Sequence, residues 1–297
     1  MNFFTDIIHI MEQTPWFFYI CITTVGLMVG SFLNVVIYRL PIMMERNFEE
    51  EYQDYFHPES EQPKKEKFNL MVPASHCPKC NHKISAWENI PILSYLILRG
   101  KCHKCGLPIS VRYPLVEGFT AIMTFFTAYH FGPSVAALGA VLLTWCLIAI
   151  SGIDFDKMLI PDEIVLPLIW IGLLFNINGT YTDLTSAVIG AILGYMILWC
   201  FYWGFKLCTG KEGMGYGDFK LTACFGAWLG YKMLGIVIIG SALVGAIVGF
   251  MTMAKTNNGK SKPIPFGPYI ALAGFTGMLY GRNINEWYIE FIIFLRS

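Results

Sequence analysis

Apolar residues gather into eight runs along the chain, and short polar segments separate the runs. Several runs are about 20 residues long, the length that a helix needs to cross the hydrocarbon core of a bilayer. Two of the runs are short, and the number of spans within 219–253 is open. The apolar tail 287–295 is too short to cross the membrane and is expected at the membrane interface. The pattern predicts about eight transmembrane helices, at roughly 16–39, 115–131, 134–153, 164–177, 184–207, 219–231, 233–253 and 267–281.

Composition supports this all-α, polytopic membrane protein. Hydrophobic residues make up 55% of the chain and charged residues only 14%, whereas soluble domains carry about 25% charged residues. The net charge is zero, which argues against a nucleic-acid partner. Residues 1–15 hold no Lys or Arg, so we expect no ordinary cleavable signal peptide and a first run that stays as a helix.

The basic residues predict the orientation. If eight spans alternate, 18 of the 21 Lys and Arg residues fall on one side, and only Lys232, Arg282 and Arg296 fall on the other. Basic residues concentrate on the cytoplasmic side of membrane proteins. The richly basic segment 40–114 is therefore expected in the cytoplasm, and both termini are expected outside.

Three parts follow from this topology: a first transmembrane helix in 1–39, a cytoplasmic loop domain in 40–114 and a transmembrane core in 115–297. Residues 44–70 are rich in Glu, Lys, Gln and Pro, which is typical of a mobile insert. Small residues also recur at four-residue spacing, which lets membrane helices approach closely. These pairs are Gly26 and Gly30, Gly190 and Gly194, and Gly245 and Gly249.

Four cysteines in the loop domain form two C-x-x-C pairs, Cys77 with Cys80 and Cys102 with Cys105. Paired turns of this kind place four thiolates on a tetrahedron, as structural Zn²⁺ requires. Two disulfides are the alternative, but they need an oxidising compartment, and the charge pattern places the loop in the reducing cytoplasm. Four protein ligands leave no position for a catalytic water, so the predicted zinc is structural.

Two aspartates, Asp154 and Asp218, each lie where a long apolar segment meets a short polar one. A carboxylate at a membrane boundary is costly unless it is hydrated, paired or used. Two of them can converge into an aspartyl-protease dyad, in which like charges share one proton. Gly215 and Gly217 beside Asp218 would permit close approach of a substrate backbone. The alternative is a pair of hydrated boundary carboxylates with no catalytic role.

Taken in order, these motifs resemble those of the bifunctional type IV prepilin peptidases, and the resemblance covers nearly the whole chain. The zinc loop favours this bifunctional form over archaeal preflagellin peptidases, which share the dyad but lack the loop. Residues 44–70 depart from the compact family pattern and touch no motif. Besides the cysteine pairs, the matching stretches are 30–41 (GSFLNVVIYRLP), 89–95 (NIPILSY), 99–102 (RGKC), 112–117 (RYPLVE), 154–162 (DFDKMLIPD), 215–218 (GYGD) and 264–268 (IPFGP).

The resemblance implies a multi-pass aspartyl protease of the bacterial inner membrane that works at the cytoplasmic face. Its substrates would be prepilins and pseudopilins, whose short basic leader it removes. It would then transfer a methyl group from S-adenosylmethionine to the new N-terminal amine. Asp154 and Asp218 would be the catalytic pair, one ionised to activate a water and the other protonated to polarise the scissile carbonyl. The sequence predicts no oligomeric state.

Charged neighbours of the aspartates have weaker assignments. Asp162 follows a proline at a predicted helix start, where an acidic residue favours the first turn. Lys157 and Lys220 would either tune the pair or contact lipid headgroups.

No soluble-type nucleotide fingerprint is present for the methyl donor. We expect a site between the zinc loop and the membrane helices, where the alternative for each residue is loop packing or ion pairing. The candidates are Glu88, Asn89, Gly100, Arg112 and Glu117.

Two functions of other classes compete with the peptidase. A transporter or channel would carry its aspartates on an ion path near helix centres, whereas these lie at the ends of predicted spans. An assembly scaffold could dock pilus or secretion components through the loop domain, but it leaves both aspartates unexplained.

Overall fold

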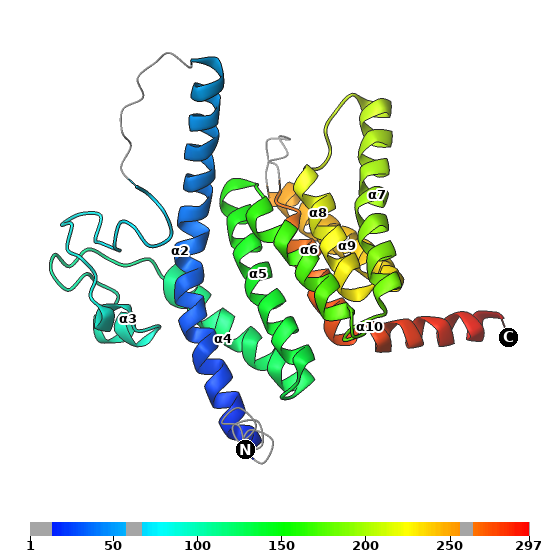
Figure 1. Cartoon of the computed structure of the whole chain (residues 1–297), viewed down its shortest axis with the longest axis horizontal. Helices are drawn as coiled ribbons and strands as arrows, with labels where there is room; N and C mark the ends of the chain where they lie inside the picture. Colours follow the sequence, from blue (N-terminus) through cyan, green and yellow to red (C-terminus); the bar gives the residue numbers. More distant parts are fainter. Residues whose placement is uncertain (1–13, 58–66, 256–263, 297) are drawn as a thin grey trace. The chain divides into compact units, whose positions relative to one another are not determined.

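A computed structural model describes residues 14–57, 67–255 and 264–296 (Figure 1). Within these residues the fold is helical and has no strand beyond two isolated bridges. The chain forms two compact units, Met1–Tyr129 and His130–Ser297. Each unit holds one of the two predicted sites. The division at 40 and 115 stays a prediction.

The first unit is built on α2 (Pro15–Phe56), which begins with a proline in its first turn and continues far beyond the apolar run. It also holds η1 (Ala86–Asn89), α3 (Leu93–Ile97) and most of α4 (Arg112–Phe131). Residues 44–56, the first part of the predicted mobile insert, are thus helical. Residues 58–66 lie outside the described residues, and the mobility of the insert stays a prediction.

Small residues bring α2 and α4 into close contact. A Cβ atom at Gly30 would lie 2.8 Å from Glu117 Cα, and one at Gly26 would collide with a threonine side chain of α4. This confirms the packing role predicted for the first glycine pair. Nearer the start of α4, the buried Asn34 amide donates to the carbonyl of Tyr113 over 3.1 Å.

A buried arginine ties the start of the cysteine loop to α2. Arg39 donates to the carbonyls of Asn69 (2.9 Å) and Pro73 (2.7 Å), and its guanidinium lies over the Phe68 ring. Removing a guanidinium from water is costly unless its N–H groups find acceptors. The loop backbone supplies these acceptors, so the charge fixes where the loop leaves the helix.

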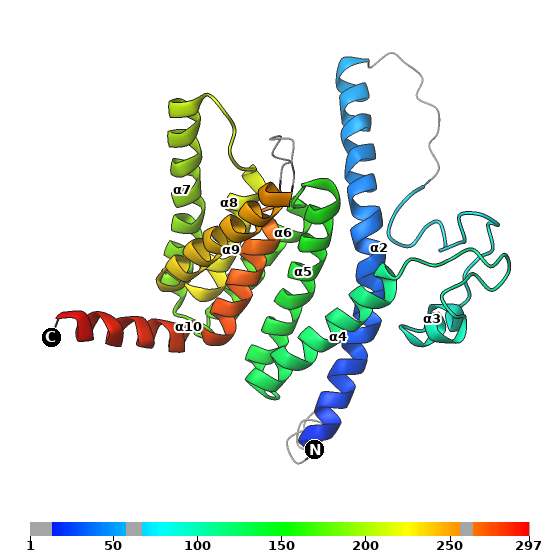
Figure 2. The same ribbon diagram turned by 180° about the vertical axis from the view of Figure 1, so that it is seen from behind.

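The second unit is a bundle of six described helices, and α8 lies at its centre. Its residues from Phe219 to Trp228 are nearly all buried, and α8 packs against α6, α7 and α10 (Figure 1, Figure 2). Gly194 of α7 faces the α8 backbone, where an added Cβ would lie 2.7 Å from Thr222 O. The six helices are α5 (Val135–Lys157), α6 (Asp162–Asn176), α7 (Leu184–Thr209), α8 (Tyr216–Leu229), α9 (Leu234–Lys255) and α10 (Gly267–Arg296).

The side-chain amide of Asn176 forms hydrogen bonds with backbone groups at the C-terminal end of α8. Asn176 is fully buried and donates to the carbonyls of Ala227 and Trp228, each over 2.9 Å. Its oxygen accepts from the backbone N–H groups of Tyr181 and Thr182. This network satisfies orphan groups at the helix end and fixes α8 along its axis, which positions Asp218 at the other end.

Every predicted span coincides with a helix, but only part of the count is established. Among the described residues, four helices are long and apolar enough to cross a membrane: Pro15–Phe56, Val135–Lys157, Leu184–Thr209 and Tyr231–Thr252. With 15 and 14 residues, α6 and α8 extend only about 22 Å at 1.5 Å per residue, less than a bilayer core. The chain is thus a membrane protein with several apolar helices, and the number eight stays a prediction.

Candidate functional sites

The first cysteine pair lies on a tight turn closed by local hydrogen bonds. Asn81 N donates to Cys77 O, and Cys77 N donates to His82 O, each over 2.9 Å. Asn81 has a φ of 53°, a left-handed conformation that Asn tolerates better than most residues. The turn therefore follows from residues that are neighbours in the sequence.

The second pair repeats this turn. Gly106 N donates to Cys102 O (3.0 Å), and Cys102 N donates to Leu107 O (2.8 Å). Gly106 has a φ of 69°, in the position that Asn81 occupies in the first turn. The two turns form a repeated structural unit around the cysteines.

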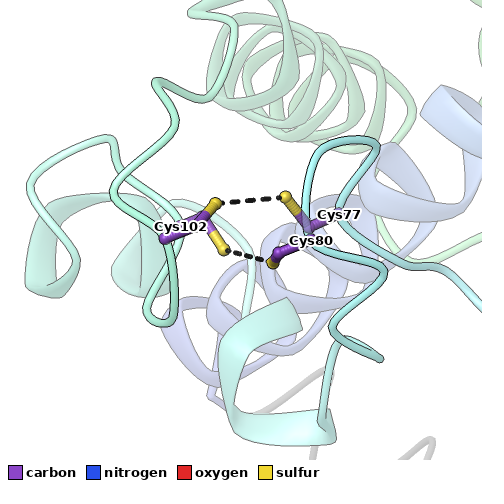
Figure 3. Close-up of side chains that lie close together, drawn as sticks. Cys77, Cys80 and Cys102 are labelled. Carbon is purple, nitrogen blue, oxygen red and sulfur yellow. Dashed lines mark hydrogen bonds between the residues drawn. The ribbon is translucent and has the colours of Figure 1, made fainter.

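The two turns face each other, so the four sulfurs form one cluster (Figure 3). Cys77 Sγ lies 3.7 Å from Cys105 Sγ, and Cys80 Sγ lies 4.0 Å from Cys102 Sγ. A disulfide would need about 2.05 Å, and all nine cysteines are free thiols. All four sulfurs lie within 4.8 Å of one another, so they can hold a metal ion.

An acidic side chain supports the first turn. Glu88 accepts from Ser85 N (2.8 Å) and Ser85 Oγ (2.7 Å), and it lies 3.1 Å from His82 Nε2. The Ser85 backbone N–H, the Ser85 hydroxyl and His82 lower the pKa of Glu88 to about 2. Glu88 is therefore ionised at neutral pH and holds η1 beside the cysteines. Its predicted part in methyl-donor binding is untested.

The other methyl-donor candidates surround α3. Buried Glu117 of α4 accepts from the N–H of Ile92, just before α3, over 2.7 Å. Gly100 follows α3 with a φ of 67°, and a Cβ there would lie 2.9 Å from the Tyr95 ring. Asn89 and Arg112 are exposed. The structure thus gathers these residues around one short helix.

Asp154 lies in the last turn of α5 and is 5% exposed. Its Oδ2 accepts from the backbone N–H of Gly267, the first residue of α10, over 2.9 Å. A Cβ at Gly267 would lie 2.7 Å from this oxygen, so only glycine permits the approach. The positive end of the α10 dipole favours the negative charge.

Asp218 occupies the first turn of α8 and is 6% exposed. Its Oδ2 accepts from Gly215 N at the cap of the same helix over 3.1 Å. The two aspartates are thus held in the same way: each has one carboxylate oxygen bound by a glycine N–H at a helix N-terminus.

One apolar side chain joins the two helix starts. Ile160 packs on Gly217 of α8, where an added Cβ would lie 2.7 Å from Ile160 Cβ, and on Gly267 of α10. The two aspartates therefore converge, and their carboxylates are close enough for Coulombic interaction. Their catalytic role stays a prediction.

An ion pair links Asp162, two residues after Ile160, to α8. Lys220 Nζ of α8 donates to both carboxylate oxygens of Asp162, over 2.7 Å and 2.6 Å. Asp162 lies in the first turn of α6, as predicted, but no side-chain cap bond forms at this helix start. The pair thus closes the segment between α5 and α6 against α8. Sequence reasoning missed this pairing because 58 positions separate its partners.

Comparison with known proteins relates both units to one family. Residues 24–131 match the bacterial peptidase A24 N-terminal domain, and residues 141–250 match the type IV leader peptidase family. The prepilin leader peptidase/N-methyltransferase of Aeromonas hydrophila is 53% identical over 283 residues, covering 95% of this chain and 98% of that protein. The chain belongs to the type IV leader peptidase family.

Other members of the type IV leader peptidase family extend this similarity. The prepilin leader peptidase/N-methyltransferase of Pseudomonas aeruginosa is 50% identical over 281 residues, covering 95% of this chain and 97% of that protein. The one from Legionella pneumophila is 42% identical over 277 residues, covering 93% and 96%. No solved structure matches the chain. The four cysteines fall in the matched N-terminal domain, and both aspartates fall in the matched peptidase range.

Proposed function

We propose that this protein removes the leader peptide of type IV prepilins and pseudopilins and methylates the new N-terminal residue. Family membership and the names of relatives that match it along almost their whole length support both activities. The two activities occur in order, because the amine to be methylated does not exist before cleavage.

Convergence of Asp154 and Asp218 is the observation that carries the peptidase assignment. Both carboxylates are nearly buried, and each has one oxygen held by a glycine N–H. Ile160 fixes the two helix starts against each other. Such fixed geometry is what general acid–base chemistry requires of its two groups.

The proposed cleavage needs one ionised and one protonated carboxylate. Two like charges at close range do not ionise together, so the pair loses its protons in separate steps. The ionised group accepts a proton from water as that water attacks the scissile carbonyl, and the protonated group donates to the carbonyl oxygen. The protein forms no covalent intermediate in this scheme.

The metal of the cysteine cluster is proposed to be zinc with a structural role. With Zn–S bonds of about 2.3 Å, the edge of a tetrahedron of sulfurs is about 3.8 Å. The observed separations of 3.7 Å and 4.0 Å fit this edge. Four thiolates fill the coordination shell, so the metal would tie the two turns together and leave no position for a reacting water.

The residues around α3 suit S-adenosylmethionine in part. When bound, this group supplies an electrophilic methyl for attack by the neutral N-terminal amine. The guanidinium of Arg112 suits a carboxylate, and the Asn89 amide can bond ribose or amino groups. Glu88 and Glu117 already accept hydrogen bonds within the loop, so we assign them to positioning α3 and η1.

The protein is proposed to be a multi-pass protein of the bacterial inner membrane, with its reacting groups at the cytoplasmic face. The four long apolar helices support membrane insertion. The distribution of Lys and Arg supports the orientation.

A direct assay separates the three candidate functions. Purified protein in lipid nanodiscs is incubated with a leader-bearing prepilin and S-adenosylmethionine, and product masses are read. A peptidase–methyltransferase yields mature pilin that is about 14 Da heavier than the cleaved chain (the mass of CH₂). Intact prepilin after incubation with metal-loaded protein would overturn the proposal and leave a transporter or scaffold.

A further inference from the structure

The short helix α3 presents an apolar face that the first unit does not cover. Leu93, Leu96 and Ile97 are 56%, 64% and 70% exposed. Their i, i+3, i+4 spacing puts them on one side of the helix. Tyr95 faces inward instead, toward Gly100.

Contacts with α4 determine how deep the apolar face of α3 would lie relative to the membrane. The Ile92 N–H donates to Glu117, and the Ile92 side chain approaches Gly118. Glu117 comes five residues after Arg112, the first residue of α4, which is about 7.5 Å along the helix axis. It also lies within the span predicted at 115–131. The start of α3 is therefore level with the first turns of a helix that is expected to enter the bilayer.

Charge in this region suits a phospholipid surface. Residues 89–116 contain no Asp or Glu, and they hold Arg99, Lys101, Lys104 and Arg112. All four of these side chains are exposed. On α4, the exposed apolar side chains of Leu115 and Phe119 lie on the same helix face as Arg112. Apolar side chains next to cations are typical of segments that lie in the headgroup region.

We propose that α3 is an interfacial anchor whose Leu93, Leu96 and Ile97 enter the acyl region of the cytoplasmic leaflet, while Arg99 and Lys101 contact lipid phosphates. A bilayer fits better than a soluble partner because the start of α3 is level with the first turns of α4, whose predicted span 115–131 would place them at the membrane surface. The anchor rests on the proposed orientation of the chain and is independent of the aspartate chemistry. It holds the methyl-donor candidates at the surface where a newly formed N-terminus emerges.

Photo-crosslinking in nanodiscs tests this anchor. A benzophenone side chain is placed at position 97, with position 126 on α4 as the lipid-facing reference. Position 55 is the aqueous control, because Tyr55 lies 16 residues beyond Arg39 on α2, about 24 Å along the axis. We expect phospholipid adducts at 97 and 126 and none at 55. Lipid adducts at 126 but not at 97 overturn the proposal, as does a main adduct at 97 with prepilin or with another part of this chain.

Lipid charge tests the role assigned to the cations. Omitting anionic phospholipid should lower the adduct yield at 97 severalfold and leave the yield at 126 unchanged. Arg99→Gln combined with Lys101→Gln should have the same effect in anionic nanodiscs. An unchanged yield at 97 in both experiments would refute the proposed phosphate contacts.

Discussion

The cysteine cluster and the aspartate site are built over very different distances in the sequence. Each cysteine pair lies on one short turn whose hydrogen bonds join residues at most five positions apart. The aspartate site instead joins α5, α8 and α10, and the Gly267 N–H that holds Asp154 lies 113 positions from it. Local turns tolerate change elsewhere in the fold, whereas the convergence of the aspartates requires several helices to pack correctly. Damage to one site should therefore leave the other largely intact.

The largest expected effect comes from Asp218→Asn or Asp154→Asn. Each change removes a titratable group from a pair that works as a unit, so cleavage should fall by more than the usual 10²–10⁴-fold. Prepilin conversion by purified protein measures the loss, and metal content should stay at the wild-type level. Near-normal conversion by either variant would remove that residue from the catalytic role.

Gly267→Ala should also impair cleavage, although it touches no titratable group. The new Cβ would lie 2.7 Å from Asp154 Oδ2 and 3.0 Å from Ile160 Cδ1, so the carboxylate must shift. A misplacement of about 1 Å can cost 10²-fold in rate. Gly204→Ala in α7 is a matched control, because its Cβ would meet nothing within 4 Å and the backbone there has no positive φ. Equal activity of the two variants would contradict the proposed positioning by Gly267.

Changing Cys102 and Cys105 to Ser together should remove the metal. We expect about one equivalent of zinc in the wild type and none in the variant, because two thiolates cannot fill the shell. Metal analysis of purified protein measures this. Methylation should fall more than cleavage, which depends on the second unit. Cleavage and methylation lost to the same degree would mean that the units are not separable.

Gly100→Val should lower N-methylation and leave cleavage largely intact. A branched side chain at a φ of 67° is strained, and its Cβ would press on the Tyr95 ring. The change would therefore displace α3 and the methyl-donor candidates around it. The mass of mature pilin measures the effect, since each missing methyl lowers it by about 14 Da. Normal methylation would exclude this segment from the methyl-donor site.

The smallest effect is expected from Lys220→Met. This change breaks the ion pair with Asp162, whose side chain is 47% exposed, and such pairs contribute little, about 0–1 kcal/mol. Cleavage should therefore fall only about two- to fivefold. Exchange of the two charges, by Lys220→Asp with Asp162→Lys, should restore part of the rate. A loss as large as that of Asp218→Asn would indicate a direct catalytic role for Lys220.

Local features of the sequence determined the apolar helices and the cysteine cluster. A C-x-x-C pair needs only its own turn and a residue that tolerates a positive φ, such as Asn81 or Gly106. Apolar runs likewise marked where helices form, but they did not mark where α2 ends, because residues beyond 39 stay helical without being apolar. An apolar run marks the part of a helix that would be buried in lipid. The full length of the helix also depends on the intrinsic helix propensity of the polar residues that follow.

Only the tertiary structure decided which backbone groups hold the aspartates and which side chains fix them. In the sequence, Gly267 and Ile160 were only members of matching stretches, and Lys220 was expected either to tune the aspartate pair or to contact lipid headgroups. Their roles arise because α8 and α10 begin beside the end of α5. Contacts between residues far apart in the chain depend on how whole helices pack, and a pattern of neighbouring residues carries little of that information.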